Sequence, residues 1–480
     1  MNLKFRAKDY TSGDSFESAE YEYFGNETEG WEIKRNGSPY LHLGPGYIPL
    51  KTISCGVCST DIDRRFLPFP LPQIIGHEVL AEGLGENQGK QFVVEINDTF
   101  EARGDKNLDA FCKEGIPTHS PERRVLGIDR LPGGFGPYIL APIHAAISLE
   151  GVSPKAAVLM EPFAAALQAI LASPPKSGDH VAVLGPRRLG SLILAALASY
   201  RKTNQSNFRI TAITRHDHLV ILSKAMGADE IVDLRKTDFT ELKNKFDIVY
   251  DTTSTASGFE SALQIAKREV HLKTTNGQVM AGIAHLTELV VDELSILPYS
   301  ESNTLFHWQK ETRKNQNVFV FSSVSETIKE NLKKQFIVFE GSSSDGETIL
   351  NSDVFSNKLP RFDLVVVSNP DELSLAIRPN PNHENSLVRP RGAILVDSTN
   401  SKNWPDNSSL VAKFFANGKE IHSSRCGDFH IAISLLRDNP DITKALETNL
   451  ISHRFSSDQL ELAYSTAKDP SSVKVVVDFT

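Results

Sequence analysis

The stretch that most restricts the fold is "GDHVAVLGPRRLGSLILAALASYRK" at 178–202. It reads as a short buried strand, a tight turn bounded by glycines, and a helix with apolar residues at i, i+3, i+4 and i+7. Further apolar strands, separated by helical stretches, follow at 209–214, 230–234, 246–253 and 269–275. Strands that alternate with helices in this way predict an α/β fold with a doubly wound parallel sheet.

The part of the chain that precedes this sheet has a different pattern. Up to about residue 152, apolar runs such as "YIPLKTI" and "QFVVEI" are separated by turns rich in Gly and Pro. Because helical periodicity is weak there, the pattern predicts a β-rich domain. A helix start at Ser153-Pro154 marks the change. A chain of 480 residues is also too long for a single core, so separate domains are expected.

The second half of the chain contains an internal echo. "FDIVYDTTSTASGFESALQIA" at 246–266 resembles "FDLVVVSNPDELSLAIRP" at 362–379, and two shorter matches follow in the same order. They link 272–276 with 395–400, and 292–296 with 418–422. The echo predicts a partial duplication within 297–420. Its first strand, "VFVFSS", is followed by no glycine turn, so this copy should lack a phosphate cradle and extend the sheet or serve assembly or partner binding.

The composition argues against several kinds of partner. A net charge of −9 and a pI near 5.9 leave no basic stripe for a nucleic acid. The first residues lack the apolar core of a signal peptide, and no run of about 18 apolar residues occurs, so we expect no membrane partner and a cytoplasmic location. Four cysteines in a chain of this length are not a disulfide framework, which leaves thiols free to hold metal.

A histidine in "IIGHEVLAEG" at 74–83 raises the question of a metal site. Taken alone, His77 is more simply a hydrogen-bonded core histidine. Cys58 lies upstream of it, and Glu161 stands at a helix entry in "LMEPFAAALQAI". One thiolate, one imidazole and one carboxylate suit zinc and leave its fourth position open, as a Lewis-acid catalyst requires.

Taken together, these motifs resemble the zinc-containing medium-chain dehydrogenase/reductase family, in its alcohol, polyol and threonine dehydrogenase-like branch. "CGVCSTD", "GHE", "MEP", "RRVLGIDRLPGGFGPYILAP", "LVVDELSI" and "SSRCGDF" follow the family's order, and the resemblance covers about 40–300 and 420–480. It implies a GroES-like catalytic domain at 1–152, completed by about 421–480, and a Rossmann-like nucleotide-binding domain at 153–296. Residues 297–420 would be an insertion that carries the duplication.

The resemblance also implies a ligand set for one catalytic zinc. Cys58, His77 and Glu161 match the family's metal ligands, whereas Cys55 is expected to be a packed thiol despite the Cys-x-x-Cys spacing. The family often carries four cysteines around a structural zinc as well. Here the corresponding segment, 97–124, keeps Cys112 alone, so no structural zinc is expected.

Three further residues near these ligands match catalytic positions of the family. Thr60 matches the hydroxyl that relays the substrate proton, and Asp61 the carboxylate that orients the zinc-bound imidazole. Glu78 matches a glutamate that can exchange into the metal's shell. The family's relay frequently includes a histidine after Thr-Asp, but Asp63 stands there in this chain. The proton would then leave through Asp63, water or the cofactor ribose.

The turn "GPRRLG" at 185–190 departs from the G-x-G-x-x-G fingerprint of dinucleotide-binding folds. Gly185 and Gly190 remain, but Arg187 replaces the central glycine, which lets the backbone approach the pyrophosphate. An arginine there could partly compensate by pairing with the phosphate. Arg188 and Leu189 complete the expected phosphate-binding turn.

The ribose end of the expected nucleotide site also departs from the fingerprint. No acidic residue follows about 20 residues later to hold the ribose diol, and Thr214 and Arg215 stand near that strand end instead. Arg215 favours NADP(H) over NAD(H), although a solvated loop arginine is an equally good interpretation. The nicotinamide is expected beside the loops at 252–255 and 274–277.

The resulting hypothesis is a zinc-dependent oxidoreductase (EC 1.1.1.-) that interconverts an alcohol and a carbonyl compound by hydride transfer with NADP(H) or NAD(H). Its partner would be a small-molecule substrate whose identity the sequence does not give. One alternative is a non-catalytic relative in which 297–420 serves assembly or partner binding. Another is a zinc enzyme that uses no nicotinamide. A homodimer is left open, because the family usually assembles through its last sheet strand and the insertion begins at that strand.

Overall fold

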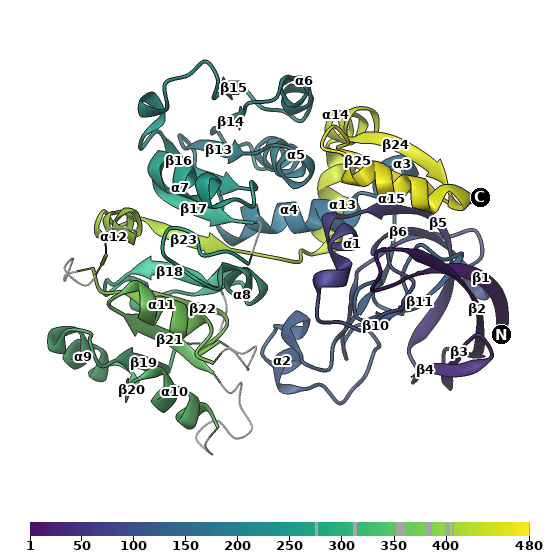
Figure 1. Cartoon of the computed structure of the whole chain (residues 1–480), viewed down its shortest axis with the longest axis horizontal. Helices are drawn as coiled ribbons and strands as arrows, with labels where there is room; N and C mark the ends of the chain where they lie inside the picture. The colour runs from purple at the N-terminus through teal and green to yellow at the C-terminus, as the bar shows by residue number, and fades with distance from the viewer. Residues whose placement is uncertain are drawn as a thin grey trace. The chain divides into compact units, whose positions relative to one another are not determined.

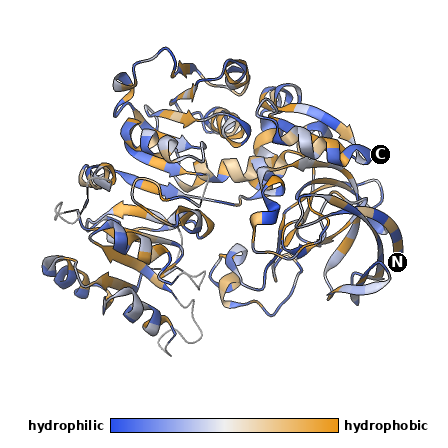
Figure 2. Cartoon of the chain, viewed as in Figure 1, coloured by the Kyte–Doolittle hydropathy of each residue, from blue (hydrophilic) through white to orange (hydrophobic). Residues whose placement is uncertain are grey.

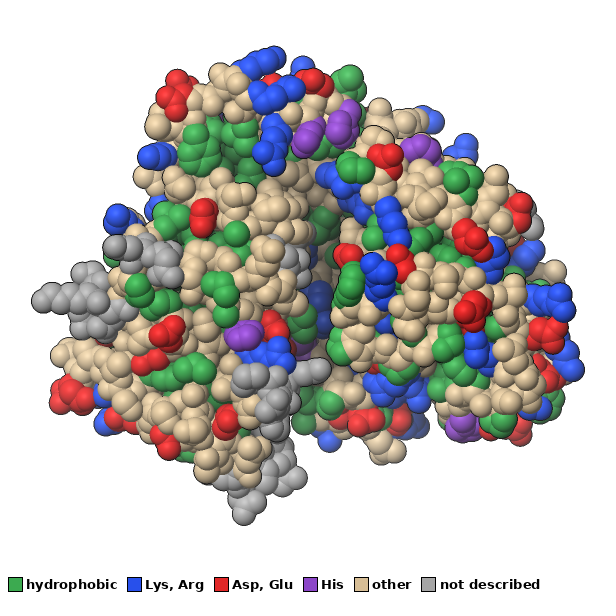
Figure 3. All heavy atoms as spheres, in the orientation of Figure 1, with side chains coloured by type: hydrophobic (Ala, Val, Ile, Leu, Met, Phe, Trp, Pro, Cys, Tyr) green, Lys and Arg blue, Asp and Glu red, His purple; other side chains and the backbone are tan. Residues whose placement is uncertain are grey.

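The computed structural model describes residues 1–273, 277–310, 314–351, 361–380, 386–398, 404–405 and 408–479 (Figure 1). Contacts divide the chain into two compact units, one formed by 1–164 with 427–480 and the other by 165–426. In the described part of the chain, no helix has the length and apolarity that a bilayer crossing demands. Lys, Arg, Asp and Glu side chains are interspersed over the face visible in Figure 3.

The first unit is built mainly from strands. They are β1 (Asn2–Tyr10), β2 (Phe16–Asn26), β3 (Gly30–Arg35), β4 (Ser38–Leu43), β5 (Tyr47–Val57), β6 (Glu78–Gly83), β7 (Gln91–Val94), β8 (Asn97–Asp98), β9 (Arg124–Leu126), β10 (Arg130–Leu131), β11 (Tyr138–Pro142), β12 (Ala146–Ser148), β24 (Ile451–Ser456) and β25 (Lys474–Asp478). Short helices connect them: α1 (Ser59–Ile62), α2 (Ala110–Lys113), α3 (Pro154–Ala157), α13 (Phe429–Asp438), α14 (Pro440–Ala445) and α15 (Leu460–Lys468).

These strands form three sheets. The orders are β1-β2-β3-β4, β10-β9-β8, and β12-β7-β6-β5-β25-β24 with β11 paired to β5. Strand β2 shows why the chain forms such sheets, because Tyr21 and Tyr23 point into the core while Glu20 and Glu22 point away from it. The C-terminal strand β25 pairs with β5, so the end of the chain completes the sheet that precedes Cys58.

The second unit alternates strands and helices. Its strands are β13 (His180–Leu184), β14 (Arg209–Thr214), β15 (Glu230–Asp233), β16 (Phe246–Asp251), β17 (Ala266–Leu272), β18 (Ser295–Pro298), β19 (Asn317–Phe321), β20 (Ile337–Gly341), β21 (Phe362–Val367), β22 (Val388–Val396) and β23 (Glu420–Ser423). Its helices are α5 (Arg188–Thr203), α6 (Asp217–Ala225), α7 (Ala256–Ile265), α8 (Leu286–Val291), α9 (Glu326–Lys333), α10 (Ser343–Leu350), α11 (Pro370–Ile377) and α12 (Ser409–Ala416). α4 (Met160–Ala172) contains the boundary between the units.

All these strands join one sheet in the order β15-β14-β13-β16-β17-β23-β18-β22-β21-β19-β20. Strands such as β13 and β21 are buried over their whole length, as parallel strands covered on both faces must be, and Figure 2 shows the sheet rich in hydrophobic residues. The sheet has two parallel blocks that meet where β18 and β23 run antiparallel. The carboxyl ends of the two blocks therefore lie at opposite edges of the sheet.

The predicted duplication accounts for the two blocks. β16-α7-β17 in the first block corresponds to β21-α11-β22 in the second, and these are the stretches that the sequence echo links. The strands that follow them are exchanged. β18 follows β17 in the chain but pairs with β22, whereas β23 follows β22 but pairs with β17. Each block thus takes one strand from the other half of the unit.

The exchange changes the expected division of the chain. The segment 297–420, predicted as a separate insertion, lies within the second unit because β18 and β23 tie both blocks into one sheet. The unit boundaries fall after residues 164 and 426, whereas the sequence placed them near 152 and 420. The predicted strand at 269–275 is β17, which ends at Leu272; residues 274–276 lie outside the described residues.

Candidate active site

Two neighbouring strands bring the predicted metal residues together. β5 ends at Val57, directly before Cys58, and β6 begins at Glu78, directly after His77. The two strands pair antiparallel, with Gly56 opposite Glu78. Side chains from separate sequence motifs therefore leave the same end of this sheet.

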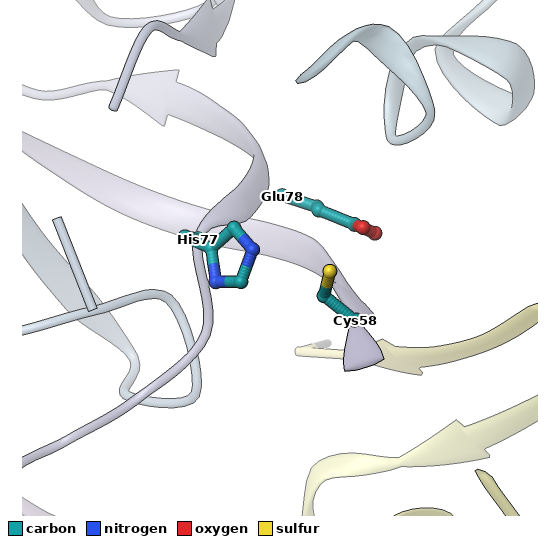
Figure 4. Close-up of side chains that lie close together, drawn as sticks. All are labelled: Cys58, His77 and Glu78. Atoms are coloured by element: carbon teal, nitrogen blue, oxygen red, sulfur yellow. The ribbon is translucent and has the colours of Figure 1, made fainter. Parts of the chain in front are cut away.

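Cys58, His77 and Glu78 form a candidate metal centre (Figure 4). One ligand atom of each lies within 4.8 Å of the other two, a somewhat wider spacing than that of ligands held about 2.0–2.3 Å from a shared zinc ion. His77 and Glu78 are buried, while Cys58 is partly accessible. A soft thiolate, an imidazole and a hard carboxylate are a donor set that fits zinc.

Glu161, the third ligand predicted from the sequence, is not one of these three residues. It stands in the first turn of α4 and is half-buried. Burial raises the pKa of Glu161 to about 7, while the charge of His77 lowers it and that of Glu78 raises it. The carboxyl group therefore lies within electrostatic reach of the centre, and its role as a ligand stays a prediction.

The carboxylate of Asp61 contacts both the backbone next to the candidate ligands and the imidazole of His77. Its buried carboxylate accepts hydrogen bonds from the amides of Cys58 (2.8 Å) and Gly76 (3.2 Å). Its Oδ1 also lies 3.2 Å from Nδ1 of His77, which leaves Nε2 for a metal. Burial disfavours a charged imidazole, but Asp61 and Cys58 favour it more strongly and hold the pKa of His77 well above its ordinary value.

Thr60 and Asp63, the residues predicted to carry the substrate proton, lie on the same short helix as Asp61 or at its end. The Oγ1 of Thr60 is 3.7 Å from the Sγ of Cys58, and its side chain is half-buried. Asp63 caps the carboxyl end of α1 and is exposed. The helix thus runs from the candidate metal centre to solvent.

Two glycines make room for the centre. Gly76 has a φ of +95°, and a Cβ there would lie 2.9 Å from both the Sγ of Cys55 and the ring of Phe135. At Gly56, a Cβ would come within 2.0 Å of Oε2 of Glu78. A side chain at either position would displace a neighbour of the metal residues.

Lys474 is a residue of this centre that the sequence reasoning missed. It stands at the start of β25, is buried, pairs with the Glu78 carboxylate and donates a hydrogen bond to the carbonyl oxygen of Val57 (3.1 Å). No hydrogen-bond donor among the described residues reaches Oε1 of Glu78, so this buried oxygen can bind a cation. The one available signal was a lysine within the otherwise apolar run "VKVVV", because a buried ammonium group needs an anionic partner.

The remaining cysteines of the first unit differ from Cys58. Cys55 is fully buried, and burial raises its pKa well above the ordinary value, so the thiol form is favoured. Cys112 lies in α2, where burial raises its pKa to about 11. Neither is among the clustered metal-type side chains of the described residues.

In the second unit, the turn after β13 keeps the close glycine packing that the dinucleotide fingerprint predicts. Gly185 has a φ of +82°, and a Cβ at Gly190 would lie 2.7 Å from the carbonyl oxygen of Gly185. The helix start is therefore packed against the turn, which is the role of the last glycine in the fingerprint. Arg187 is the N-cap residue of α5, and Arg188 and Leu189 begin the helix. The loop 252–255 follows β16, whereas most of 274–277 is outside the described residues.

At the end of β14, Arg215 does not pair with the nearby acidic residues, because these bind another arginine. Thr214 is buried at the strand end, and Arg215 follows it, exposed and without an ion pair in the described part of the chain. Two aspartates lie close in sequence or space, but Arg235 binds both Asp217 and Asp233. Arg215 is thus a cation next to the strand end, while these two aspartates are paired with Arg235.

The first unit also has a cavity of about 540 Å³ apart from the metal residues. Tyr47, Phe100, Arg103, Lys106 and Arg124 are among the residues that line it. It contains none of the predicted site residues.

The sequence is similar to known dehydrogenases over part of its length. No protein-family model matches it. It is 32% identical over 161 residues to the L-galactonate-5-dehydrogenase of Escherichia coli K12, covering 31% of this chain and 44% of that protein. It is 26% identical over 236 residues to the D-arabitol-phosphate dehydrogenase of Enterococcus avium, covering 46% and 65%. The chain thus matches less than two thirds of each relative's length.

The fold is shared over nearly the whole chain. A protein described as a zinc-binding dehydrogenase from Sinorhizobium meliloti 1021, solved with NADP bound, superposes with a TM-score of 0.53 at 16% identity and 99% coverage of both chains. This likeness confirms the predicted fold class, a GroES-like β-rich domain and a doubly wound Rossmann-type sheet, to which the partial duplication is added. In sequence and in fold, this chain is similar to the zinc-type medium-chain dehydrogenases, as its motifs predict.

Proposed function

We propose that this protein is an oxidoreductase with one catalytic zinc that interconverts an alcohol and a carbonyl compound by hydride transfer with NADP(H) or NAD(H). The convergence of Cys58 and His77 beside two acidic side chains, Glu78 within 4.8 Å and Glu161 within electrostatic reach, carries the proposal. An inert scaffold would gain little from a buried carboxylate oxygen that lacks a donor beside a thiol and an imidazole. The names of the relatives and the NADP-bound neighbour support a nicotinamide cofactor.

When bound, zinc would supply Lewis-acid chemistry that lowers the pKa of a substrate alcohol or polarises a carbonyl group. The chain's own residues supply orientation and a proton route. Asp61 fixes the imidazole of His77 through the contact at Nδ1. The hydroxyl of Thr60, next to Cys58, accepts the proton of the substrate alcohol and releases its own, which exposed Asp63 passes to water.

The proposal retains Glu161 as the third metal ligand. Lys474 already neutralises Glu78, whereas Glu161 has no ion pair within the described residues. Glu161→Gln should therefore lose most of its bound zinc, while Glu78→Gln should keep zinc and lose the pairing with Lys474. Metal analysis of the two purified variants tests this assignment. Full zinc in the Glu161 variant with loss in the Glu78 variant would reverse the two roles.

The function itself is tested on the full chain purified in the presence of zinc. We expect about one zinc per chain, a change in NADPH fluorescence on mixing, and zinc-dependent oxidation of some members of a panel of secondary alcohols and polyols. Zinc binding without any nucleotide binding would instead support a nicotinamide-independent enzyme. Absence of both would support a non-catalytic scaffold.

Arg215 should determine the preference for the phosphorylated nucleotide. Its guanidinium is exposed at the end of β14. Arg235 forms ion pairs with Asp217 and Asp233, so these carboxylates are not available to a ribose diol. A charge-assisted contact with a 2′-phosphate is worth roughly 1.5–3 kcal/mol, so Arg215→Ala should weaken NADPH binding about 10- to 100-fold. Fluorescence titration should show NADH binding little changed.

Arg209→Ala is the matched control, because Arg209 is an exposed arginine at the opposite end of the same strand. It should leave the affinity for both nucleotides at the unmodified level. Equal losses of NADPH affinity in the two variants would show a general charge effect and remove Arg215 from the site.

A further inference from the structure

A tyrosine of the C-terminal helix reaches α1, the short helix that follows the predicted metal ligand Cys58. The Oη of Tyr464, on α15, lies 3.2 Å from the carbonyl oxygen of Asp61 and 3.1 Å from that of Ile62. It also lies 3.0 Å from Oη of Tyr10 and 3.1 Å from Oδ1 of Asp14. The side chain is buried, so these four oxygens decide where its single proton goes.

Of the two side-chain oxygens, Oδ1 of Asp14 has other donors, whereas the oxygen of Tyr10 accepts from the Tyr464 hydroxyl. The hydroxyl of Tyr10 donates to Oδ1 of Asp14 at 2.8 Å, and the ammonium of Lys468 donates to both oxygens of Asp14 at 3.0 and 2.8 Å. The hydroxyl of Tyr464 therefore donates to the oxygen of Tyr10 and to the carbonyl oxygens at the end of α1. Burial raises the pKa of Tyr464 above its ordinary value, so the hydroxyl stays a donor over the physiological pH range.

The residue held in this way is the one that organises the centre. The carboxylate of Asp61 accepts hydrogen bonds from the amides of Cys58 and Gly76 and contacts the ring of His77. A displacement of the Asp61 backbone would therefore move its carboxylate away from both predicted ligands. Tyr464 is therefore connected, through Asp61 at the end of α1, to the side chains of Cys58 and His77.

We propose that Tyr464 is a positioning residue that holds the α1 loop so that Cys58 and His77 present their donors to one metal ion. This inference rests on the proposed zinc site. It assigns to the C-terminal segment a part in metal binding that goes beyond completing the sheet through β25. Residues that orient metal ligands typically change metal affinity about 10- to 100-fold when they are replaced.

Tyr464→Phe tests the proposal, because it removes one hydroxyl and keeps the ring. In the full chain, we expect Zn²⁺ and Co²⁺ affinity, measured by competition with a chromophoric chelator, to fall about 10-fold or more. The visible absorption of the Co²⁺ form should shift as its ligand geometry changes. Tyr21→Phe is the matched control, since Tyr21 is a buried tyrosine of the same unit that donates to Asp9 at 2.7 Å.

A second measurement separates this proposal from the zinc site itself. In the metal-free chain, hydrogen exchange at the amides of Cys58 and Gly76 should become faster in Tyr464→Phe and stay unchanged in Tyr21→Phe. Unchanged exchange and unchanged Co²⁺ affinity in Tyr464→Phe would overturn the positioning role, as would equal losses of affinity in both variants. A chain that takes up no metal but shows faster exchange in Tyr464→Phe would overturn the zinc site and leave Tyr464 as the residue that holds the loop.

Discussion

Cys58→Ser should reduce bound zinc from about one ion per chain to roughly a tenth of that, because it removes the thiolate from a site with only three protein ligands. Oxidation of any alcohol that the unmodified protein accepts should fall at least about 100-fold, since the Lewis-acid contribution amounts to several kcal/mol. Metal analysis and a steady-state rate assay measure the two effects. The fold should persist, because the side chain of Cys58 is only partly buried.

Cys55→Ser is the matched control, three residues earlier in the same motif. Cys55 is fully buried, its thiol form is favoured, and it lies outside the cluster of Cys58, His77 and Glu78. The serine should therefore cost some stability and leave the zinc content unchanged. If the Cys55 variant lost its zinc and the Cys58 variant kept it, Cys55 and not Cys58 would be the metal ligand.

Gly76→Ala should both destabilise the first unit and deplete its metal. The position has a φ of +95°, and the new Cβ would meet the Sγ of Cys55 and the ring of Phe135 at 2.9 Å. Strain and overpacking together should lower the free energy of unfolding by about 2–4 kcal/mol. His77 follows directly, so the displaced backbone should also carry the imidazole away from Cys58. Thermal unfolding and metal analysis measure the two effects.

Gly37→Ala separates the backbone strain from the clash. Gly37 has a similar φ of +76°, but no atom lies within 4 Å of its Cβ position. This variant should cost only about 1–2 kcal/mol and keep its zinc. If Gly37→Ala and Gly76→Ala lost stability and metal equally, the tight packing around Gly76 would have no part in the site.

The sequence predicted the elements of the second unit well, because its strands are short apolar runs between helices. The strand at 209–214 coincides with β14, and the turn at 185–190 joins β13 to α5. Cys58 and His77 could be proposed as metal ligands because they fall in short motifs with an order, and the structure brings the two side chains close together. Such patterns depend on residues that are close in the chain, which is why one sequence suffices to find them.

What the sequence did not predict depends on contacts between distant segments. Lys474 pairs with Glu78, and Tyr464 reaches Asp61, although hundreds of residues separate the partners in each case. The echo in 297–420 predicted a duplication but not the exchange of β18 and β23. Both are short strands of similar character, so local pattern gives no reason to pair either with one neighbour over the other.

The exchanged strands have a consequence for how the second unit comes apart. A protease cut between β18 and β19 would leave one piece whose β17 still needs β23, and another whose β22 still needs β18. The two pieces would stay associated through these strand pairs after the peptide bond is broken, and neither would fold by itself. Nicking this chain should therefore leave its size in solution unchanged, and melting should release both blocks in a single step.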